Sequence, residues 1–367
     1  MARFIYRAEA DGRPVCGIQD AGSAAEAIAL LEARGLAGIH LQNHLLNAVM
    51  PLDTQGLSDT QYACTYQYFQ QHFGWRAFFA MFFRRTWGLW LGCLGLGAWM
   101  AMNGDWLWMA LVLAAPLGML ALGAWKFRDA QAFNALLADI ARGEWLQAQA
   151  RIHRLRRKIH DESVAMELDV QQACLLARQG DMAQARAVLD VWQPVMDLLM
   201  PGMFAAHLGR VFLAARDQQQ VLTYYRQSME QADGDAAMVL DCALMEARYG
   251  SPARAHCLLL DLDDATLPEQ GYAFVPWVTG IIALRQGRNA DAVDNLQQAV
   301  TGLQPLADNP AVWPSLAMMA GDLACSLLAL ERIEQADQAA RPVWPVLSVH
   351  GDPDQLAALR RAIPDLP

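Results

Sequence analysis

The sequence lacks the short motifs that mark the common classes of enzyme. It contains no GxxxxGK[ST] phosphate loop, no HExxH zinc motif, no GxSxG nucleophile turn and no GxGxxG after a predicted strand. The acidic residues Asp261, Asp263 and Asp264 lack the glycine and distal glutamate of a calcium loop, so we expect a solvated loop there. We therefore predict no catalytic residue, no bound metal and no cofactor.

Charged residues are also scarce, at 18% of the 367 positions, whereas apolar residues make up 54%. This balance predicts a soluble body joined to a short membrane region. Residues 161–367 carry 13 Lys and Arg against 27 Asp and Glu, a net charge of −14. Nucleic-acid binding requires a basic surface, so we expect no nucleic-acid partner.

Two other familiar sequence features, a CxxC pair and a signal peptide, are missing as well. The seven cysteines form no CxxC pair, which favours buried, reduced thiols over disulfides or metal ligands. The opening residues, Met1 to Arg7, lack the apolar core and the cleavage site of a signal peptide, so we expect no cleaved leader.

Two stretches, residues 86–102 and 106–125, contain no charged side chain at all. Each is close to the length that crosses a hydrocarbon core of about 30 Å as a helix. Asn103 to Asp105 supplies a tight turn between them, which predicts a transmembrane helical hairpin. By the positive-inside rule both chain ends then lie in the cytoplasm, because cations flank the outer ends of the hairpin. These cations are Arg84, Arg85, Lys126 and Arg128.

A glycine pair in the first hairpin helix and an aromatic segment before it each allow two interpretations. Gly88 and Gly92 either dimerise the first helix through a GxxxG contact or pack it against the second helix. The aromatic-rich segment from Tyr66 to Phe83 either lies along the cytoplasmic leaflet as an interfacial helix or binds a partner.

Residues 3–42 predict a small α+β unit. Phe4–Ala8 and Val15–Gln19 read as strands, Ala24–Arg34 as a helix and Ala37–Leu41 as a third strand. The pattern Phe4-x-Tyr6-x-Ala8, Asp11-Gly12, Gly17-x-x-x-Ala21, Ser23-x-x-Glu26-Ala27 and Leu30-Leu31-x-x-x-Gly35-Leu36 resembles the small leading domain of type II secretion F-component and type IV pilus platform proteins. The resemblance implies a secretion or pilus-type setting; the alternative is a generic fold without that link.

From residue 130 the apolar spacing is helical, and the pattern repeats. Successive turn residues are 37, 36, 34, 37 and 44 positions apart, and a small residue follows each by five. The turn residues are Gly143, Gly180, Arg216, Gly250, Gly287 and Glu331. The small residues are Ala148, Ala185, Val221, Ala255, Ala292 and Ala336.

This register resembles that of the tetratricopeptide-repeat family. Seven positions before the middle turns are further small residues, where paired helices approach closely: Ala173, Gly209, Ala243, Gly280 and Ala324. The resemblance implies a curved α-solenoid whose concave face binds a protein segment. Helical phase then gives candidate partner-binding residues on that face, with a solvated surface as the alternative for each. They are Gln171, Arg178, Arg210, Glu246 and Arg285.

A basic helix follows the hairpin. Residues 126–160 carry eight Lys and Arg against three Asp and Glu, a net charge of +5. Anionic lipid headgroups attract such a segment, so we expect headgroup contact; a solvated face and a metal pair at His153 and His160 are alternatives. The residues concerned are Arg151, Arg154, Arg156, Arg157 and Lys158.

The predicted organisation is mainly α. A small α+β domain (1–45) precedes a linker and interfacial helix (46–83), a transmembrane hairpin (84–128), about six tetratricopeptide-like repeats (129–350) and an irregular tail (351–367). We expect a multi-pass inner-membrane protein with both termini in the cytoplasm and a scaffold function through a protein partner. The alternatives are a self-associating structural protein, that is a homo-oligomer, or an uncharacterised membrane enzyme.

Overall fold

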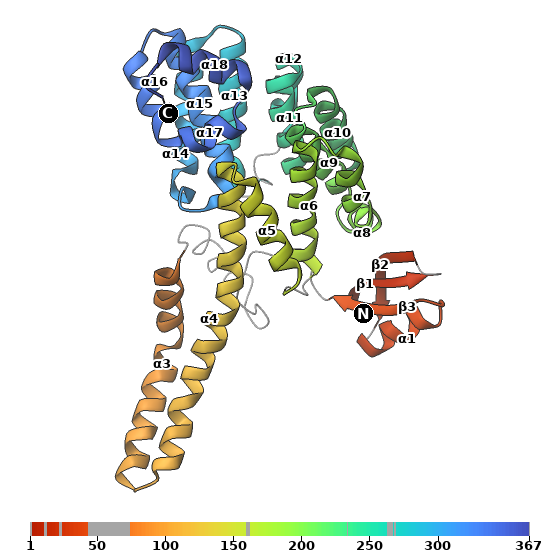
Figure 1. The fold of residues 1–367 in the computed structure, drawn as a ribbon, viewed down its shortest axis with the longest axis vertical. Helices are drawn as coiled ribbons and strands as arrows, with labels where there is room; N and C mark the ends of the chain where they lie inside the picture. The colour runs from red at the N-terminus through yellow and green to blue at the C-terminus, as the bar shows by residue number, and fades with distance from the viewer. Residues whose placement is uncertain are drawn as a thin grey trace.

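The chain is mainly helical, as the composition and periodicity predict. The computed structural model describes residues 2–10, 13–21, 24–42, 74–158, 162–232, 234–262, 267 and 269–366. A small sheet, a long helical hairpin and a large helical body follow one another along the chain (Figure 1).

The N-terminal segment forms an antiparallel three-stranded sheet of order β2-β1-β3. Its elements are β1 (Ala2–Ala10), β2 (Arg13–Ala21), α1 (Ala24–Glu32) and β3 (Ala37–Gln42). Leu31 of α1 is buried with Tyr6 and Ala8 of the central strand. This small apolar core lies between the helix and the sheet.

Two long helices form the hairpin, α3 (Trp75–Met102) and α4 (Trp106–Arg142). The described part of the predicted interfacial segment, residues 75–83, is the beginning of α3 itself, so a separate helix ending at Phe83 is wrong. The ring of Phe78 stacks on that of Phe127 in α4, with 4.7 Å between the ring centroids. This contact fixes the base of the hairpin, because both rings are buried.

Helix α4 does not stop at the predicted boundary of residue 128. It runs without a break through 37 residues, about 55 Å at 1.5 Å per residue. The basic residues after the apolar stretch change the surface of the helix but not its backbone. The hairpin and the helical body therefore share one continuous helix.

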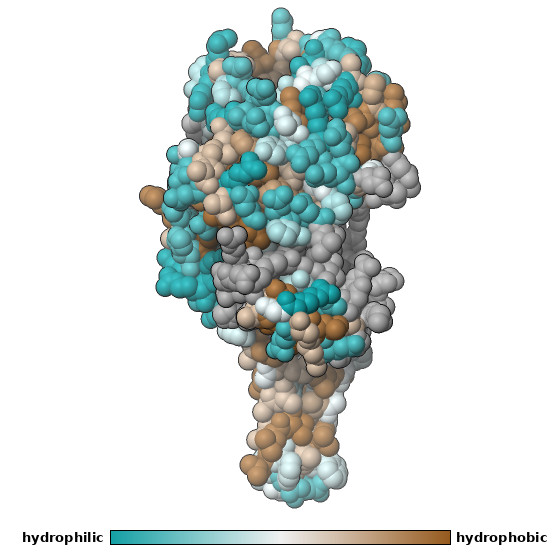
Figure 2. All heavy atoms as spheres, turned by 90° about the vertical axis from the view of Figure 1, so that its right-hand side faces the viewer, coloured by the Kyte–Doolittle hydropathy of each residue, from teal (hydrophilic) through white to brown (hydrophobic). Residues whose placement is uncertain are grey.

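Large apolar side chains cover the outside of the hairpin (Figure 2). Met102 and Leu107 near the tip are 81% and 73% exposed, and tryptophans lie exposed along both helices. Soluble monomers rarely expose contiguous apolar surfaces of this size. The exposed tryptophans are Trp75, Trp87, Trp99, Trp106, Trp108 and Trp125.

Two helices of the described chain are long and apolar enough to cross a membrane by length and composition, Trp106–Arg142 and Pro310–Ala329. The apolar window of the second is 56% buried, so packing inside the helical body already accounts for it. The window of the first is only 6% buried. The predicted first span, 86–102, does not meet the same criterion, although α3 packs along α4. The chain is thus a candidate membrane protein.

The two glycines of the GxxxG spacing do not face α4. A Cβ atom added to Gly88 or Gly92 would meet no atom within 4 Å. By contrast, one added to Gly97 would contact Leu113 of α4 at 3.6 Å. Packing of the first helix against the second therefore does not involve Gly88 and Gly92.

The helical body consists of consecutive helix pairs, beginning with the end of α4 and α5 (Trp145–Arg156). The next pairs are α6 (Glu162–Arg178) with α7 (Met182–Asp190), α9 (Met203–Ala214) with α10 (Gln218–Gln231), and α11 (Ala236–Tyr249) with α12 (Pro252–Leu260). Then follow α13 (Phe274–Arg285) with α14 (Asn289–Leu303) and α15 (Trp313–Ala329) with α16 (Ile333–Ala340). Shorter elements are α8 (Gln193–Leu199), η2 (Glu269–Ala273), η3 (Gln304–Leu306), η4 (Pro310–Val312), η5 (Arg341–Val343), α17 (Trp344–His350) and α18 (Pro353–Ala362).

The predicted turn residues share one backbone conformation. Five of the six have a positive φ, and Gly250 is the exception. Glycine adopts this left-handed region without strain, but a side chain does not. Arg216 (φ 62°) and Glu331 (φ 61°) are the two non-glycine residues with positive φ in the described ranges. The turn geometry is therefore kept even where the glycine is absent.

The predicted small residues lie where the paired helices touch. All six residues five positions after a turn are 0% exposed. A Cβ atom on Gly209 would lie 2.7 Å from the ring of Tyr225, and one on Gly280 would lie 2.6 Å from Leu296. Since both distances are shorter than any real carbon contact, the large residue of the second helix requires a glycine on the first.

The last helices of the body pack against its first helix. The side chain of Arg142 lies over the Trp313 ring at 5.0 Å, and Nε2 of His350 is 3.3 Å from the carbonyl oxygen of Ile140. Val349 of α17 is so close that a Cβ atom on Gly143 would lie 3.0 Å from it. The sequence of helix pairs thus closes onto the end of α4.

The C-terminal residues do not form the predicted irregular tail. Leu356 and Leu359 of α18 are buried, and Gln355 donates a hydrogen bond of 2.9 Å to Asp322 in α15. The same carboxylate accepts from Trp277 Nε1 at 2.7 Å and pairs with Arg248. Asp322 therefore ties four helices together. The proline-rich stretch before α15 likewise forms η3 and η4 instead of an extended loop.

Replacing Glu331 by glycine should stabilise the protein. The substitution removes a left-handed side chain at an exposed turn, so we expect the free energy of unfolding to rise by about 0.5–1 kcal/mol. Denaturant unfolding of the full chain in detergent measures it. Glu334→Gly, two residues into α16, is the matched control and should lower stability by a similar amount. Equal losses in both variants would contradict the proposed turn geometry.

Candidate functional site

A stripe of polar residues runs along α6. Glu167, Gln171, Cys174 and Arg178 are spaced by four, three and four residues, which places them on one face of the helix. This face is directed toward α9, with which α6 packs. Side chains of α6 and α9 meet there.

The contacts between α6 and α9 are short and polar. Nε2 of Gln171 donates to Glu167 at 2.6 Å, and Glu167 forms an ion pair of 3.8 Å with Arg210. A second guanidinium nitrogen of Arg210 lies 3.4 Å from Nδ1 of His207. Together with Asp241 of α11, whose charge acts on Arg210, these residues form what we call the α6–α9–α11 cluster.

The surroundings of this cluster shift its ionisation. Burial raises the pKa of Asp241 to about 6, against the attraction of Arg210. Burial also lowers the pKa of His207 to about 3, so its imidazole is neutral at physiological pH. Yet the side chain of Arg210 is 40% exposed and Asp241 is only half-buried. Arg210 and Asp241 are therefore surrounded by protein on one side and still reach solvent on the other.

Two of the predicted partner-binding residues, Gln171 and Arg210, belong to the cluster. Arg178 lies on the same face of α6, but its guanidinium sits over the Trp145 ring at 4.4 Å and donates to the Val349 carbonyl at 3.4 Å. Burial lowers the pKa of Arg178, and the neighbouring charge of Arg216 adds to this effect. Arg178 of α6 therefore contacts both α5 and α17.

The remaining two residues lie elsewhere. Arg285 donates to the carbonyl oxygens of Ala247 at 2.8 Å and Gly250 at 3.0 Å, at the end of α11. Glu246 is 0% exposed and lies between Arg226 of α10 and Arg254 of α12. A partner cannot contact a fully buried carboxylate, so the assignment of Glu246 to an accessible face is wrong.

Two of the predicted lipid-contacting residues are engaged within the protein. Nε of Arg151 pairs with Asp139 of α4 at 2.7 Å. Arg156 pairs with Asp169 of α6, which also accepts a hydrogen bond of 2.9 Å from Trp192 Nε1. These two arginines hold α5 against its neighbours.

The other three, Arg154, Arg157 and Lys158, are exposed near the end of α5. Asp139 lies 14 residues beyond Trp125, about 21 Å along α4. Because α5 returns toward the hairpin after Arg151, Arg157 lies about 9 Å closer to it. Headgroup contact by these three cations stays a prediction.

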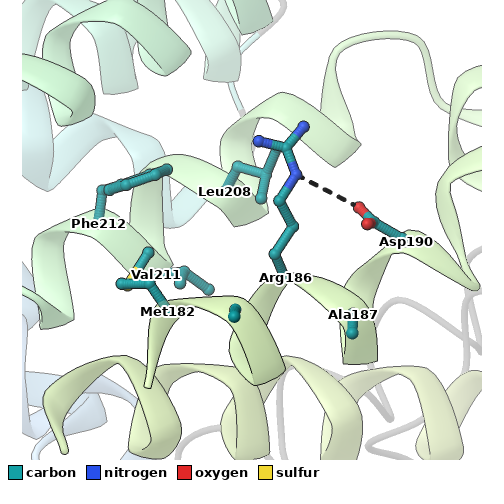
Figure 3. Close-up of a pocket in the computed structure, with 8 residues that line it drawn as sticks. Met182, Arg186, Ala187, Asp190, Leu208, Val211 and Phe212 are labelled. Carbon is teal, nitrogen blue, oxygen red and sulfur yellow. Dashed lines mark ion pairs between the residues drawn. The ribbon is translucent and has the colours of Figure 1, made fainter. Parts of the chain in front are cut away.

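A separate groove of about 370 Å³ lies between α7 and α9. Its lining is mostly apolar, with Met182, Leu208 and Phe212 among the side chains that face it (Figure 3). Arg186 and Asp190, 3.7 Å apart, are its charged residues. The lining pairs no nucleophile with a base.

Sequence reasoning missed Glu167, His207 and Asp241. The spacing on α6 would have found Glu167, which is four residues before Gln171. No comparable signal pointed to His207 or Asp241, because their importance depends on how α9 and α11 are placed beside α6.

Asp241→Asn should stabilise the protein at neutral pH. A carboxyl whose folded pKa is raised costs stability wherever it is charged, fully above about pH 6 and not at all below its ordinary value. We expect a gain on the order of 1 kcal/mol at pH 7.5, discounted for partial exposure. The gain should shrink as the pH falls from 6 toward 4. Thermal unfolding of wild type and variant across this range measures it, and a pH-independent difference would contradict the assignment.

Comparisons of the chain with protein-family models, curated proteins and solved structures find no match. The functional argument therefore rests on the geometry described above.

Proposed function

We propose that this chain is a membrane-anchored scaffold whose tetratricopeptide-like α-solenoid binds a protein partner at the cytoplasmic side of an inner membrane. The observation that carries the proposal is the direct continuation of an exposed apolar helix, α4, into a body of six helix pairs. An anchor that continues into a body with a polar surface cluster suits recruitment of another protein. We propose no enzymatic activity for it.

The hairpin supports the membrane part of the proposal. Its exposed apolar surface would be costly in water, at about 25 cal/mol per Å², and is suited to lipid. Cations precede and follow the apolar stretches, while the turn between the helices carries Asp105. This distribution favours a cytoplasmic location for the helical body.

The repeat register supports the solenoid part. Small residues lie at the helix contacts at regular intervals, and five of the six turn residues have a positive φ. In stacked repeats each pair contacts mainly its neighbours, which leaves one face free along the whole stack. We propose that the α6–α9–α11 cluster belongs to such a face, and that the exposed cations at the end of α5 contact anionic headgroups.

Self-association is the second candidate function. Gly88 and Gly92 present an open face on α3, which would allow two hairpins to approach closely. The proposed setting for either function is a secretion or pilus-type assembly, on the strength of the resemblance in residues 3–42.

The membrane anchor predicts resistance to extraction. We expect the protein to remain in the membrane fraction after a carbonate wash, because two spanning helices are not displaced by high pH. A reporter enzyme fused after Pro367 should be active in the cytoplasm. Release by carbonate would contradict the membrane anchor. Reporter activity only outside the cytoplasm would contradict the proposed orientation.

Photo-crosslinking in native membranes tests the scaffold function. A crosslinking amino acid at position 210, in the cluster and 40% exposed, should give an adduct with a different protein. The same amino acid at exposed position 294 on α14 is the control and should not. Adducts only between copies of the chain would favour self-association, and equal adducts from both positions would reject a specific face.

A further inference from the structure

The helical body closes on itself at a place where the chain does not connect its elements. Nε2 of His350 in α17 lies 3.3 Å from the carbonyl oxygen of Ile140 in α4, 210 positions earlier in the sequence. Consecutive helix pairs are also joined through the backbone, whereas the two sides of this contact are held by noncovalent interactions alone. We call the contact the seam. Its residues are Ile140, Arg142, Gly143 and Arg178 on one side and Trp313, Val349 and His350 on the other.

Each interaction across the seam is weak by its geometry. Nη1 of Arg178 donates to the carbonyl oxygen of Val349 at 3.4 Å, and the contact of His350 is 3.3 Å long. Both distances exceed the usual range of about 2.7–3.2 Å for an N–H···O hydrogen bond. The Arg142 guanidinium lies over the Trp313 ring at 5.0 Å. No ion pair crosses the seam in the described ranges, whereas ion pairs join α6 to α9 and α11 to α15.

Buried apolar residues do not connect the two sides of the seam either. One cluster extends from Val221 in α10 to Leu366 near the C-terminus, and two smaller ones lie within residues 133–175 and 165–211. Both smaller clusters contain residues of α6, so they form an N-terminal half, α4–α9, beside a C-terminal half, α10–α18. None of the three clusters contains residues from both sides of the seam. Because apolar burial is the main favourable term in packing, each half is held together more strongly than the seam.

The two halves meet at the α9–α10 pair. Phe212 and Leu213 of α9 pack against the C-terminal cluster, while Val211 belongs to one of the N-terminal clusters. Helix α9 also borders the apolar groove of about 370 Å³ that it shares with α7. Close-packed interiors resist displacement, so unfilled space beside α9 favours bending at this pair.

We propose that the helical body is a clamp, in which the α4–α9 and α10–α18 halves open at the seam and bend at the α9–α10 pair. Opening breaks the hydrogen bond from Arg178 to Val349. Arg178 is the last residue of the polar stripe that begins at Glu167 on α6, so the open clamp exposes that end of the stripe to solvent. The inference rests on the fold alone and goes beyond the proposed scaffold function.

Distance measurement between two spin labels tests the clamp in the full chain, held in lipid nanodiscs. The labels are attached through a ketone-bearing amino acid, so that the native cysteines stay unlabelled. They replace the exposed residues Gln147 of α5 and Glu334 of α16, which lie in different halves. We expect a dominant short distance and a minor longer one. Arg178→Ala should raise the ratio of open to closed molecules about fivefold, because the loss of one hydrogen bond changes a population by about that factor.

Two further variants accompany this measurement. Arg142→Ala removes an exposed side chain from the seam and should raise the same ratio about threefold, the effect of one exposed cation–π contact. It retains the test where Arg178→Ala unfolds the protein. His256→Ala, on the exposed surface of α12 and away from the seam, is the control and should leave the ratio unchanged. Labels at Asp294 and Glu334, both in the C-terminal half, should give one distance in every variant.

Two outcomes would overturn the clamp. The first is a distance between positions 147 and 334 that stays the same in wild type, Arg142→Ala and Arg178→Ala. The second is equal broadening between positions 294 and 334, which would indicate general loosening of the helices. The crosslinking experiment is independent of this one: an opening seam without partner adducts would reject only the scaffold, and adducts with a seam that never opens would reject only the clamp.

Discussion

The backbone of α4 carries the main constraint in this structure. Its first half is covered by exposed apolar side chains, and its last turns are enclosed by α5 on one side and by η4, α15 and α17 on the other. Pro116 lies in the apolar half and is the position where this helix is expected to bend, and the backbone is continuous from there to Arg142. The elements that contact the last turns of α4 are therefore joined directly to the hairpin.

Polar contacts reinforce this arrangement at a few points. Asp169 and Asp322 each accept the indole N–H of a tryptophan and pair with an arginine from another helix. Such buried groups are stable only when all their partners are present. Asp241 lacks such partners in the described ranges, which distinguishes it from these two carboxylates.

The sequence predicted the local contacts of the helical body well, for a physical reason. The turn glycines and the buried small residues act within one helix pair, so their spacing alone specifies them, as at Gly209 against Tyr225. Contacts between distant elements have no such spacing. Burial of Glu246 depends on Arg226 and Arg254 from two other helices, and the contact of Gly143 with Val349 depends on the closure of the whole body.

The predicted boundaries of the hairpin helices were wrong for a different reason. Charged residues such as Arg84 and Lys126 mark where lipid contact should end, but a helix continues through them without cost. Composition therefore predicts the surface of α3 and α4 and not their length. The secretion-like N-terminal pattern remains a prediction.

The contacts between the end of α4 and α17 have a consequence for biogenesis. Arg178 and Val349 are 171 residues apart in sequence, and His350 and Ile140 are 210 apart. During synthesis the hairpin and the first helices leave the ribosome long before the residues that complete their packing. Until the final helices are translated, Trp313 and Val349 cannot cover the base of the body. A chain interrupted near its 3′ coding end would therefore carry an intact anchor and an incomplete fold, a state that cellular quality control can recognise.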